Sequence, residues 1–513
     1  MILLLQLKNH SESNTMRGTV LIILLLLLIT GLQGAVKEIT VIHTTDTHGR
    51  IYGSGNGWLK AAPAIRQEIA AAGGAANCLV IDCGDIMQGT PESAFSGGAI
   101  MIKILNELAY DVWIPGNHDF DFGSDALKTN ISNFRGTVLT ANVESTKLAG
   151  VIRPWRIFEK NNLKIAVIGM TSPNLLSYLW LPESGRLKVY GIESSLGRII
   201  AAVRQTKPDI IVLIIHHGQY SKDTALYDLT LKYPEIDLIL GGHTHQEVSG
   251  VKIGRNCWFA QAGHAAGCFG KINIAWDDDA KKIIRISSVL IPVQTATPDD
   301  NALHQAIDDD LRAVSGFYSM PIPGNPERIK EITGRLTGDP GTIIAGAMAE
   351  SSGVGIALYS HSRWPIKPEL GLNAKTIFYL MPYEDTVCTL TLNADEFKAV
   401  LHEQSAQLKK YKSSPSLYGV TTETDPQTCE VKKLILADGT PWQGTDKKIR
   451  IAFSSFPLAG GGGVFPLLRE YAADSKKLPE NTGVLVRACV RKYIEKMAAT
   501  EDKIDKNITA KKR

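Results

Sequence analysis

The 513-residue sequence has almost no excess charge of one sign, since 55 basic residues face 52 acidic ones and the net charge is +3. Nucleic-acid binding needs a dominant basic patch or stripe, so the composition gives that class of protein no support. With 44% hydrophobic and 21% charged residues, the chain is too apolar to be disordered. It is also too long for one hydrophobic core. We therefore expect two folded domains and no nucleic-acid partner.

Cysteine is also scarce. Seven cysteines in a chain of this length do not make a disulfide framework, and an odd number cannot all pair within one monomer. Cys78 and Cys83 are close in sequence, but their odd separation along a strand places them on opposite faces, which disfavours a bridge. We expect the cysteines to be small buried hydrophobic residues.

The apolar run near the start of the chain, Val20–Ile29, is shorter than the roughly 20 residues that span a bilayer. It follows Arg17 and precedes a stretch of small residues, an order typical of an export signal. We expect residues 1–35 to be a cleaved signal peptide rather than a membrane anchor. Residues 498–513 form a polar tail without a hydrophobic stretch, which argues against a C-terminal lipid anchor. The mature protein is thus expected to be periplasmic or extracellular, with no stable membrane anchor.

Short apolar, β-rich runs alternate with helical patterns through the first part of the chain, which is typical of a layered α/β domain. The runs are Ile39–Thr45, Cys78–Cys83, Val112–Pro115, Leu163–Gly169, Asp209–Ile215 and Ile236–Leu240. Helical patterns include Gly98–Tyr110 and Ser194–Thr206. Ile210–Ile215 is apolar without alternation, which predicts a central strand covered on both faces.

The composition changes after this region. We place a first domain at residues 36–298. Residues 299–326 combine an amphipathic helical pattern with the Pro-rich run Pro321–Pro326, which predicts a linker helix. A second domain is expected at residues 327–497.

Metal-type side chains follow directly on five of the apolar runs. They are Asp46, His48, Asp85, Asn117, His216, His243 and His245. Strand ends and their loops form the crevice where ligands bind in open α/β sheets, so we expect these side chains in one pocket. Carboxylate, amide oxygen and imidazole together suit borderline divalent ions such as Zn, Mn, Fe or Co.

Each motif alone is ordinary, because Asp-x-His and Gly-Asn-His-Asp are both common in turns and His216 taken alone is explained as a buried core histidine. The order is more specific. Asp-x-His, Gly-Asp, Gly-Asn-His-Asp, His-x-Gly and Gly-His-x-His, each after a strand, resemble the signature of the calcineurin-like metallophosphoesterases. The stretches His43–Gly49 and Gly116–Gly123 resemble the 5′-nucleotidase family, which includes UDP-sugar hydrolases. The resemblance covers about Val36 to Met497.

This resemblance implies an α/β fold with an N-terminal four-layer α/β/β/α metallophosphoesterase domain and a C-terminal α/β substrate-binding domain, joined by a linker helix. In the family, domain rotation accompanies turnover. The implied activity is hydrolysis of nucleotide phosphoesters with two divalent transition-metal ions. One alternative is hydrolysis of a cyclic nucleotide, a sugar nucleotide or another phosphoester at the same metals. The other is a surface binding protein without turnover, against which the retained metal-type residues argue.

The resemblance also implies roles for single residues. One ion would take Asp46, His48, Asp85 and His245, and the other would take Asp85, Asn117, His216 and His243. Asp85 would bridge the ions, and a bridging water would lose a proton and attack phosphorus. His118 resembles the family's catalytic histidine, which stabilises developing charge or protonates the leaving oxygen, and Asp121 would orient it.

The C-terminal domain departs from the family at positions that bind substrate. Thr342 and Gly346 stand where the family has Asn and Asp, and Gly462 stands where it has Asp. Arg363 is either the counterpart of an arginine that binds the substrate phosphate or a surface arginine beside Trp364.

The aromatic positions of the C-terminal domain are also ambiguous. Phe456 matches an aromatic residue that stacks on the nucleobase, and it is equally compatible with ordinary core. Its aromatic partner is missing at the expected spacing, which leaves Tyr411 and Tyr418 as substitutes. Arg335 lies near a further family arginine position.

Overall fold

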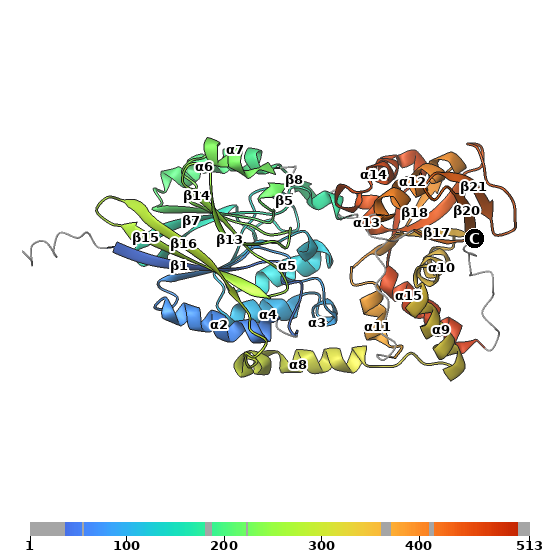
Figure 1. The fold of residues 1–513 in the computed structure, drawn as a ribbon, viewed down its shortest axis with the longest axis horizontal. Coiled ribbons are helices and arrows are strands. Elements are labelled where there is room, and N and C mark those ends of the chain that lie inside the picture. Colours follow the sequence, from blue (N-terminus) through green and yellow to red (C-terminus); the bar gives the residue numbers. More distant parts are fainter. Residues whose placement is uncertain are drawn as a thin grey trace, which may run out of the picture.

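The computed structural model describes residues 36–53, 56–179, 187–221, 224–360, 371–409 and 415–500. Its N-terminal domain is built on two six-stranded sheets (Figure 1). The first sheet has the order β16 (Lys282–Pro292), β15 (Cys268–Asp277), β1 (Val36–Thr44), β2 (Cys78–Asp82), β3 (Val112–Trp113) and β4 (Thr137–Val138). The second has the order β13 (Glu247–Ile253), β14 (Cys257–Ala262), β12 (Leu238–Leu240), β9 (Ile210–Ile215), β7 (Leu163–Met170) and β6 (Trp155–Lys160).

The two sheets pack face to face, and helices cover both outer faces. Side chains such as Val41 and Ile81 from the first sheet and Val212 from the second share one buried cluster. Helices α2 (Trp58–Ala71), α4 (Ala99–Glu107) and α5 (Gly123–Asn133) contribute to the core outside the first sheet. Helices α6 (Ile192–Gln205) and α7 (Leu226–Lys232) cover the second. The predicted four-layer α/β/β/α fold is confirmed.

Strand β9 shows why its sequence has no alternation. Its six residues are all buried. Ile210, Val212 and Ile214 face the first sheet, and the residues between them face α6 and α7. A strand covered on both faces needs apolar side chains at every position, so the predicted central strand is confirmed.

The C-terminal domain is built on one five-stranded sheet with helices on both faces (Figure 1). The strand order is β19 (Ser416–Tyr418), β17 (Ile356–Tyr359), β22 (Ile449–Ser454), β18 (Thr386–Leu392) and β23 (Glu480–Leu485). One face packs on α9 (Pro326–Gly338), α10 (Gly341–Ser352), α11 (Ala374–Leu380) and α15 (Val486–Ala499). The other packs on α12 (Ala394–Lys409), α13 (Ser455–Ala459), α14 (Pro466–Ala473) and the hairpin β20 (Val420–Thr424) and β21 (Val431–Leu436).

Helix α8 (Asn301–Tyr318) runs along both domains and joins them (Figure 1). The Asp300 side chain caps its start by accepting a hydrogen bond from the Leu303 amide. Leu303 and its neighbours one and two turns later belong to the N-terminal core, whereas Val314 and Tyr318 pack with Phe378 of α11. The linker helix of the predicted fold is thus part of the core of both domains.

Several expectations fall on residues that the structure does not describe: the signal peptide, the polar tail from residue 501, Arg363 and Tyr411 lie outside the described ranges. Among the helices in those ranges, none combines the length and hydrophobicity of a membrane span. All seven cysteines are described and unpaired, and all except Cys429 are buried.

Candidate metal centre

The seven candidate ligands lie in loops that follow β1, β2, β3, β9 and β12. The first three strands belong to one sheet and the last two to the other, so the candidate centre lies across the ends of both sheets. The structure gathers six of the seven into two groups of three, within each of which the potential ligand atoms lie no more than 4.8 Å apart.

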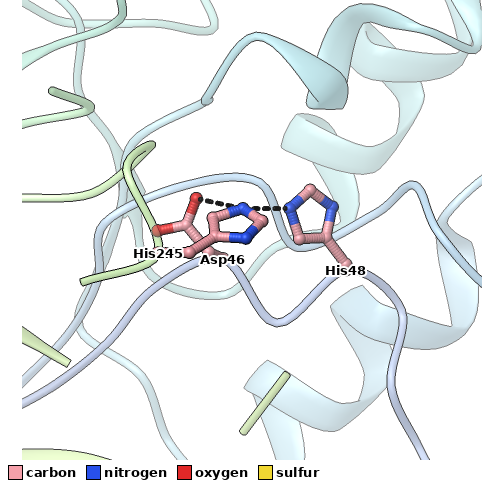
Figure 2. Close-up of side chains that lie close together, drawn as sticks. All are labelled: Asp46, His48 and His245. Carbon is pink, nitrogen blue, oxygen red and sulfur yellow. Dashed lines mark hydrogen bonds and ion pairs between the residues drawn. The ribbon is translucent and has the colours of Figure 1, made fainter. Parts of the chain in front are cut away.

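The first group is Asp46, His48 and His245 (Figure 2). The Nε2 atoms of His48 and His245 face each other at 3.0 Å, and His245 Nε2 is 3.5 Å from Asp46 Oδ1. The other ring nitrogen of His48 lies 3.1 Å from the Gln88 carbonyl oxygen, which fixes the ring orientation. Three donors from two sheets therefore point at one small space.

The second group is Asp85, His216 and His243. His216 Nε2 lies 3.0 Å from Asp85 Oδ2, and the same carboxylate oxygen lies 3.9 Å from His48 Nε2 in the first group. Asp85 is thus positioned between the two groups. Asn117 is fully buried, and neither atom of its amide group has a hydrogen-bond partner. A buried amide without a partner is costly unless a ligand satisfies it.

The protonation of three of the four histidines in these groups suits an ion. Burial lowers the pKa of His48 and of His243 to about 3, and that of His245 to about 4. These imidazoles are therefore neutral, which is the form that binds metals. Burial raises the pKa of Asp46 to about 7, an effect that a bound cation would oppose.

Asp85 and His216 form a buried pair of opposite charge. Although burial favours the neutral carboxyl, His216 and His118 hold the pKa of Asp85 well below its ordinary range. Burial also opposes the charge on His216, but Asp85 and Asp46 raise its pKa to about 10. The donor set of buried carboxylates, imidazoles and an unpartnered amide fits borderline divalent ions.

Five of the seven candidate ligands have a left-handed backbone. The φ angles are 51° for Asp46, 47° for His48, 57° for Asp85, 72° for His243 and 58° for His245. Only fourteen non-glycine residues of the described chain have positive φ, so these angles are concentrated at the centre. Such angles are uncommon and cluster at functional sites.

Two glycines allow the ligand loops to approach each other. A side chain at Gly84 would place its Cβ 2.6 Å from the Gly116 amide nitrogen, and one at Gly116 would place it 2.2 Å from Asp85 Oδ1. Neither position has room for a methyl group. The loops after β2 and β3 are therefore in direct contact, which places Asn117 beside Asp85.

His118 and Asp121 form a pair at the edge of the centre. His118 Nδ1 lies 2.8 Å from Asp121 Oδ2, and the His118 ring is 5.5 Å from the His48 ring. Burial alone would lower the pKa of His118, but Asp121 and Asp85 together raise it to about 9. The carboxylate binds Nδ1, which leaves Nε2 available to a ligand.

Residues 39–247 match the calcineurin-like phosphoesterases, and residues 328–470 match the 5′-nucleotidase C-terminal domain. The chain therefore combines a calcineurin-like phosphoesterase domain with a 5′-nucleotidase C-terminal domain. Calcineurin-like metallophosphoesterases use a dinuclear metal centre. In this chain, the two groups of side chains are the candidate ligands of such a centre.

Individual relatives agree with the family. The chain is 24% identical over 525 residues to the protein UshA of Yersinia enterocolitica, covering 90% of this chain and 91% of that protein. It is 32% identical over 231 residues to the 5′-nucleotidase of Vibrio parahaemolyticus, covering 41% and 40%. A putative 5′-nucleotidase from Staphylococcus aureus, solved with α-ketoglutarate, shares the fold with a TM-score of 0.73 at 18% identity, covering 91% of this chain and 98% of that one. The homologues indicate a phosphoester hydrolase, and they do not favour a binding protein without turnover.

The sequence motifs did not reveal the role of Asp119 in the metallophosphoesterase domain. Its carboxylate is fully buried and accepts hydrogen bonds from four backbone amides at 2.8 to 3.0 Å. Three of these amides belong to the Asp85 loop and the fourth is Gly116, so Asp119 joins the loops after β2 and β3. The sequence shows Asp119 only as the last residue of the Gly-Asn-His-Asp motif. Its four hydrogen-bond partners become evident only from the folded structure.

The substrate-side candidates are not all near the metallophosphoesterase domain. Phe456 is the second residue of α13, and its ring lies 6.3 Å from the ring of Tyr178 in the N-terminal domain. Tyr418 instead packs beside Gly346 within the C-terminal domain. A Cβ added at Gly346 would lie 3.2 Å from the Tyr418 ring and 3.1 Å from the Tyr493 hydroxyl. A Cβ at this position would require the two tyrosine side chains to shift by a few tenths of an ångström.

Arg335 lies on α9 and is paired with Glu331 of the same helix at 4.0 Å. Helix α9 is on the side of the C-terminal domain away from the metallophosphoesterase domain (Figure 1). This placement does not bring Arg335 to the candidate centre.

Proposed function

We propose that the protein hydrolyses nucleotide phosphoesters with two divalent metal ions bound by Asp46, His48, Asp85, Asn117, His216, His243 and His245. The observation that supports this most is the position of Asp85 between two groups of metal-type side chains, with His118 beside them. A carboxylate in this position suits a bridging role between two cations.

The residues around the centre supply orientation and proton transfer. When bound, two such ions activate a water molecule and stabilise negative charge on the phosphoryl oxygens. His118 contacts the leaving oxygen or the developing charge through Nε2, because Asp121 holds Nδ1. Asp119 keeps Asp85 and Asn117 in register by binding the amides of both loops.

The metal content tests this proposal directly. We expect the purified protein to bind up to two ions per chain, to lose activity when a chelator removes them, and to regain it with Mn²⁺, Zn²⁺ or Co²⁺. Elemental analysis and hydrolysis of an aryl phosphate before and after chelation measure this. A protein that contains no metal after reconstitution would refute the proposed centre.

We propose a nucleotide as the substrate because the Vibrio homologue is a 5′-nucleotidase and Phe456 offers an aromatic ring near the centre. Base stacking is worth roughly 1–3 kcal/mol, which corresponds to about five- to 150-fold in kcat/KM. We expect kcat/KM for nucleoside monophosphates to exceed that for glycerol phosphate by this factor. Phe456→Ala should remove this preference while leaving the hydrolysis of an aryl phosphate intact.

A panel of nucleotides, cyclic nucleotides, sugar nucleotides and simple esters measures this preference and separates the alternative substrates. The control is Phe95→Ala, which removes an aromatic ring that packs on Phe317 of α8. Equal rates on nucleotides and glycerol phosphate, unchanged in Phe456→Ala, would exclude the nucleotidase function and leave a two-metal phosphoesterase.

We also propose that the protein is exported, on the basis of the signal-like residues 1–35. N-terminal sequencing of the protein from its native host is expected to give a first residue near Val36. Recovery of an intact N-terminus from the cytoplasm would contradict export.

A further inference from the structure

Tyr178 touches both domains at the candidate centre. It follows the short helix η2 (Leu175–Ser177) of the metallophosphoesterase domain, and its hydroxyl lies 3.1 Å from His243 Nε2. The two rings meet edge to face, with centroids 5.5 Å apart and planes at 89°. This contact occupies one ring nitrogen of His243, so Nδ1 is the nitrogen left for an ion.

Tyr178 also meets the C-terminal domain. Its centroid lies 6.3 Å from the Phe456 ring, and η2 contacts both α13 and the glycine turn η5 (Gly461–Gly463). A Cβ at Gly462 would lie 2.8 Å from both Cζ and the hydroxyl oxygen of Tyr178. The ring therefore packs directly on the bare backbone of Gly462.

This packing gives a physical reason for glycine at position 462. The backbone there has φ of 68°, which favours glycine, and the Tyr178 ring fills the space that a side chain would need. The departure from the family at this position is thus linked to a tyrosine of the other domain.

We propose that Tyr178 is a positioning residue that couples the docking of the C-terminal domain to the orientation of His243. Because the hydroxyl end of the ring contacts both Gly462 and His243, a shift of the glycine turn moves the hydroxyl relative to the imidazole. Partners of this kind orient the ligands of metal sites, and their loss typically lowers metal affinity by roughly 10- to 100-fold. The inference rests on the proposed function, since it takes His243 as a ligand.

The test is a titration of the metal-free full-length protein with Co²⁺, followed by visible absorption and by competition with a chelator. Tyr178→Phe keeps the ring and removes the hydroxyl, and we expect it to weaken one Co²⁺ site by roughly 10-fold and to change its absorption spectrum. Gly462→Ala adds a methyl group in the C-terminal domain that displaces the Tyr178 ring. We expect this variant to weaken the same Co²⁺ site. The double variant is expected to lose less than the sum of the two, because both changes act through one contact.

Gly463→Ala is the matched control. Gly463 has φ of 92°, so alanine there meets a similar backbone penalty, but a Cβ at this position contacts nothing within 4 Å. We expect its Co²⁺ affinity to equal that of the wild type, since it does not disturb Tyr178.

The possible results are distinct. A wild-type protein that binds no Co²⁺ would refute the metal centre itself. Two normal Co²⁺ sites in both Tyr178→Phe and Gly462→Ala would overturn the role of Tyr178 while leaving the centre intact. An effect of Tyr178→Phe without one of Gly462→Ala, or an equal effect of Gly463→Ala, would overturn the coupling to the C-terminal domain.

Discussion

Replacement of Asp85 by Asn is expected to abolish phosphoester hydrolysis while the protein stays folded. Asp85 lies 3.0 Å from His216 and 3.9 Å from His48, so one change weakens the binding of both ions. Removal of a residue that only hydrogen-bonds a metal ligand costs up to roughly 100-fold. Because Asp85 is itself a proposed ligand of both ions, we expect a larger loss in kcat/KM. Hydrolysis of an aryl phosphate, together with metal analysis, measures it.

The control for this variant is Asp125→Asn, the same chemical change at an exposed carboxylate paired with Lys147. Its activity and metal content are expected to match the wild type. If Asp85→Asn retained near wild-type turnover, Asp85 would have no bridging role.

His118→Asn is expected to lower kcat by roughly 10²- to 10⁴-fold, the usual effect of removing a positioned acid or charge stabiliser. His118 is bound to Asp121 and lies beside His48 without belonging to either group of candidate ligands. The metal content of the His118→Asn variant should therefore equal that of the wild type. Elemental analysis and steady-state kinetics on the same preparation separate the two effects.

The companion variant Asp121→Asn is expected to have a smaller effect, because it leaves the imidazole in place and removes only the group that orients it. Loss of bound metal in His118→Asn would instead make His118 a ligand and would contradict its assignment as an acid or charge stabiliser.

Much of the N-terminal fold could be predicted because its signal is local. Continuous apolar runs such as Ile210–Ile215 predict buried strands, and polar residues directly after them predict a site at the strand ends. The structure places six of the seven candidate ligands in two adjacent groups, and the seventh, Asn117, follows β3. Their roles as ligands remain predictions.

Contacts between distant segments could not be predicted in this way. Tyr178 lies in a segment without a motif, and its partners His243 and Gly462 are 65 and 284 residues away. Likewise, the sequence shows only that a polar residue is missing at Gly346, whereas the structure shows the Tyr418 ring beside it. Side chains that fill each other's space are visible only once the fold brings them together.

The left-handed backbone of five candidate ligands limits which side chains are favourable at these positions. A left-handed residue costs roughly 1–2 kcal/mol for most side chains, and Asp, Asn and His adopt this conformation more readily than others. Glutamate and cysteine offer equally good donor atoms for many ions but are not enriched in this conformation. At Asp46 and Asp85, with φ of 51° and 57°, aspartate therefore satisfies the ion and the backbone together. A replacement at these positions has to fit the left-handed backbone as well as the ion.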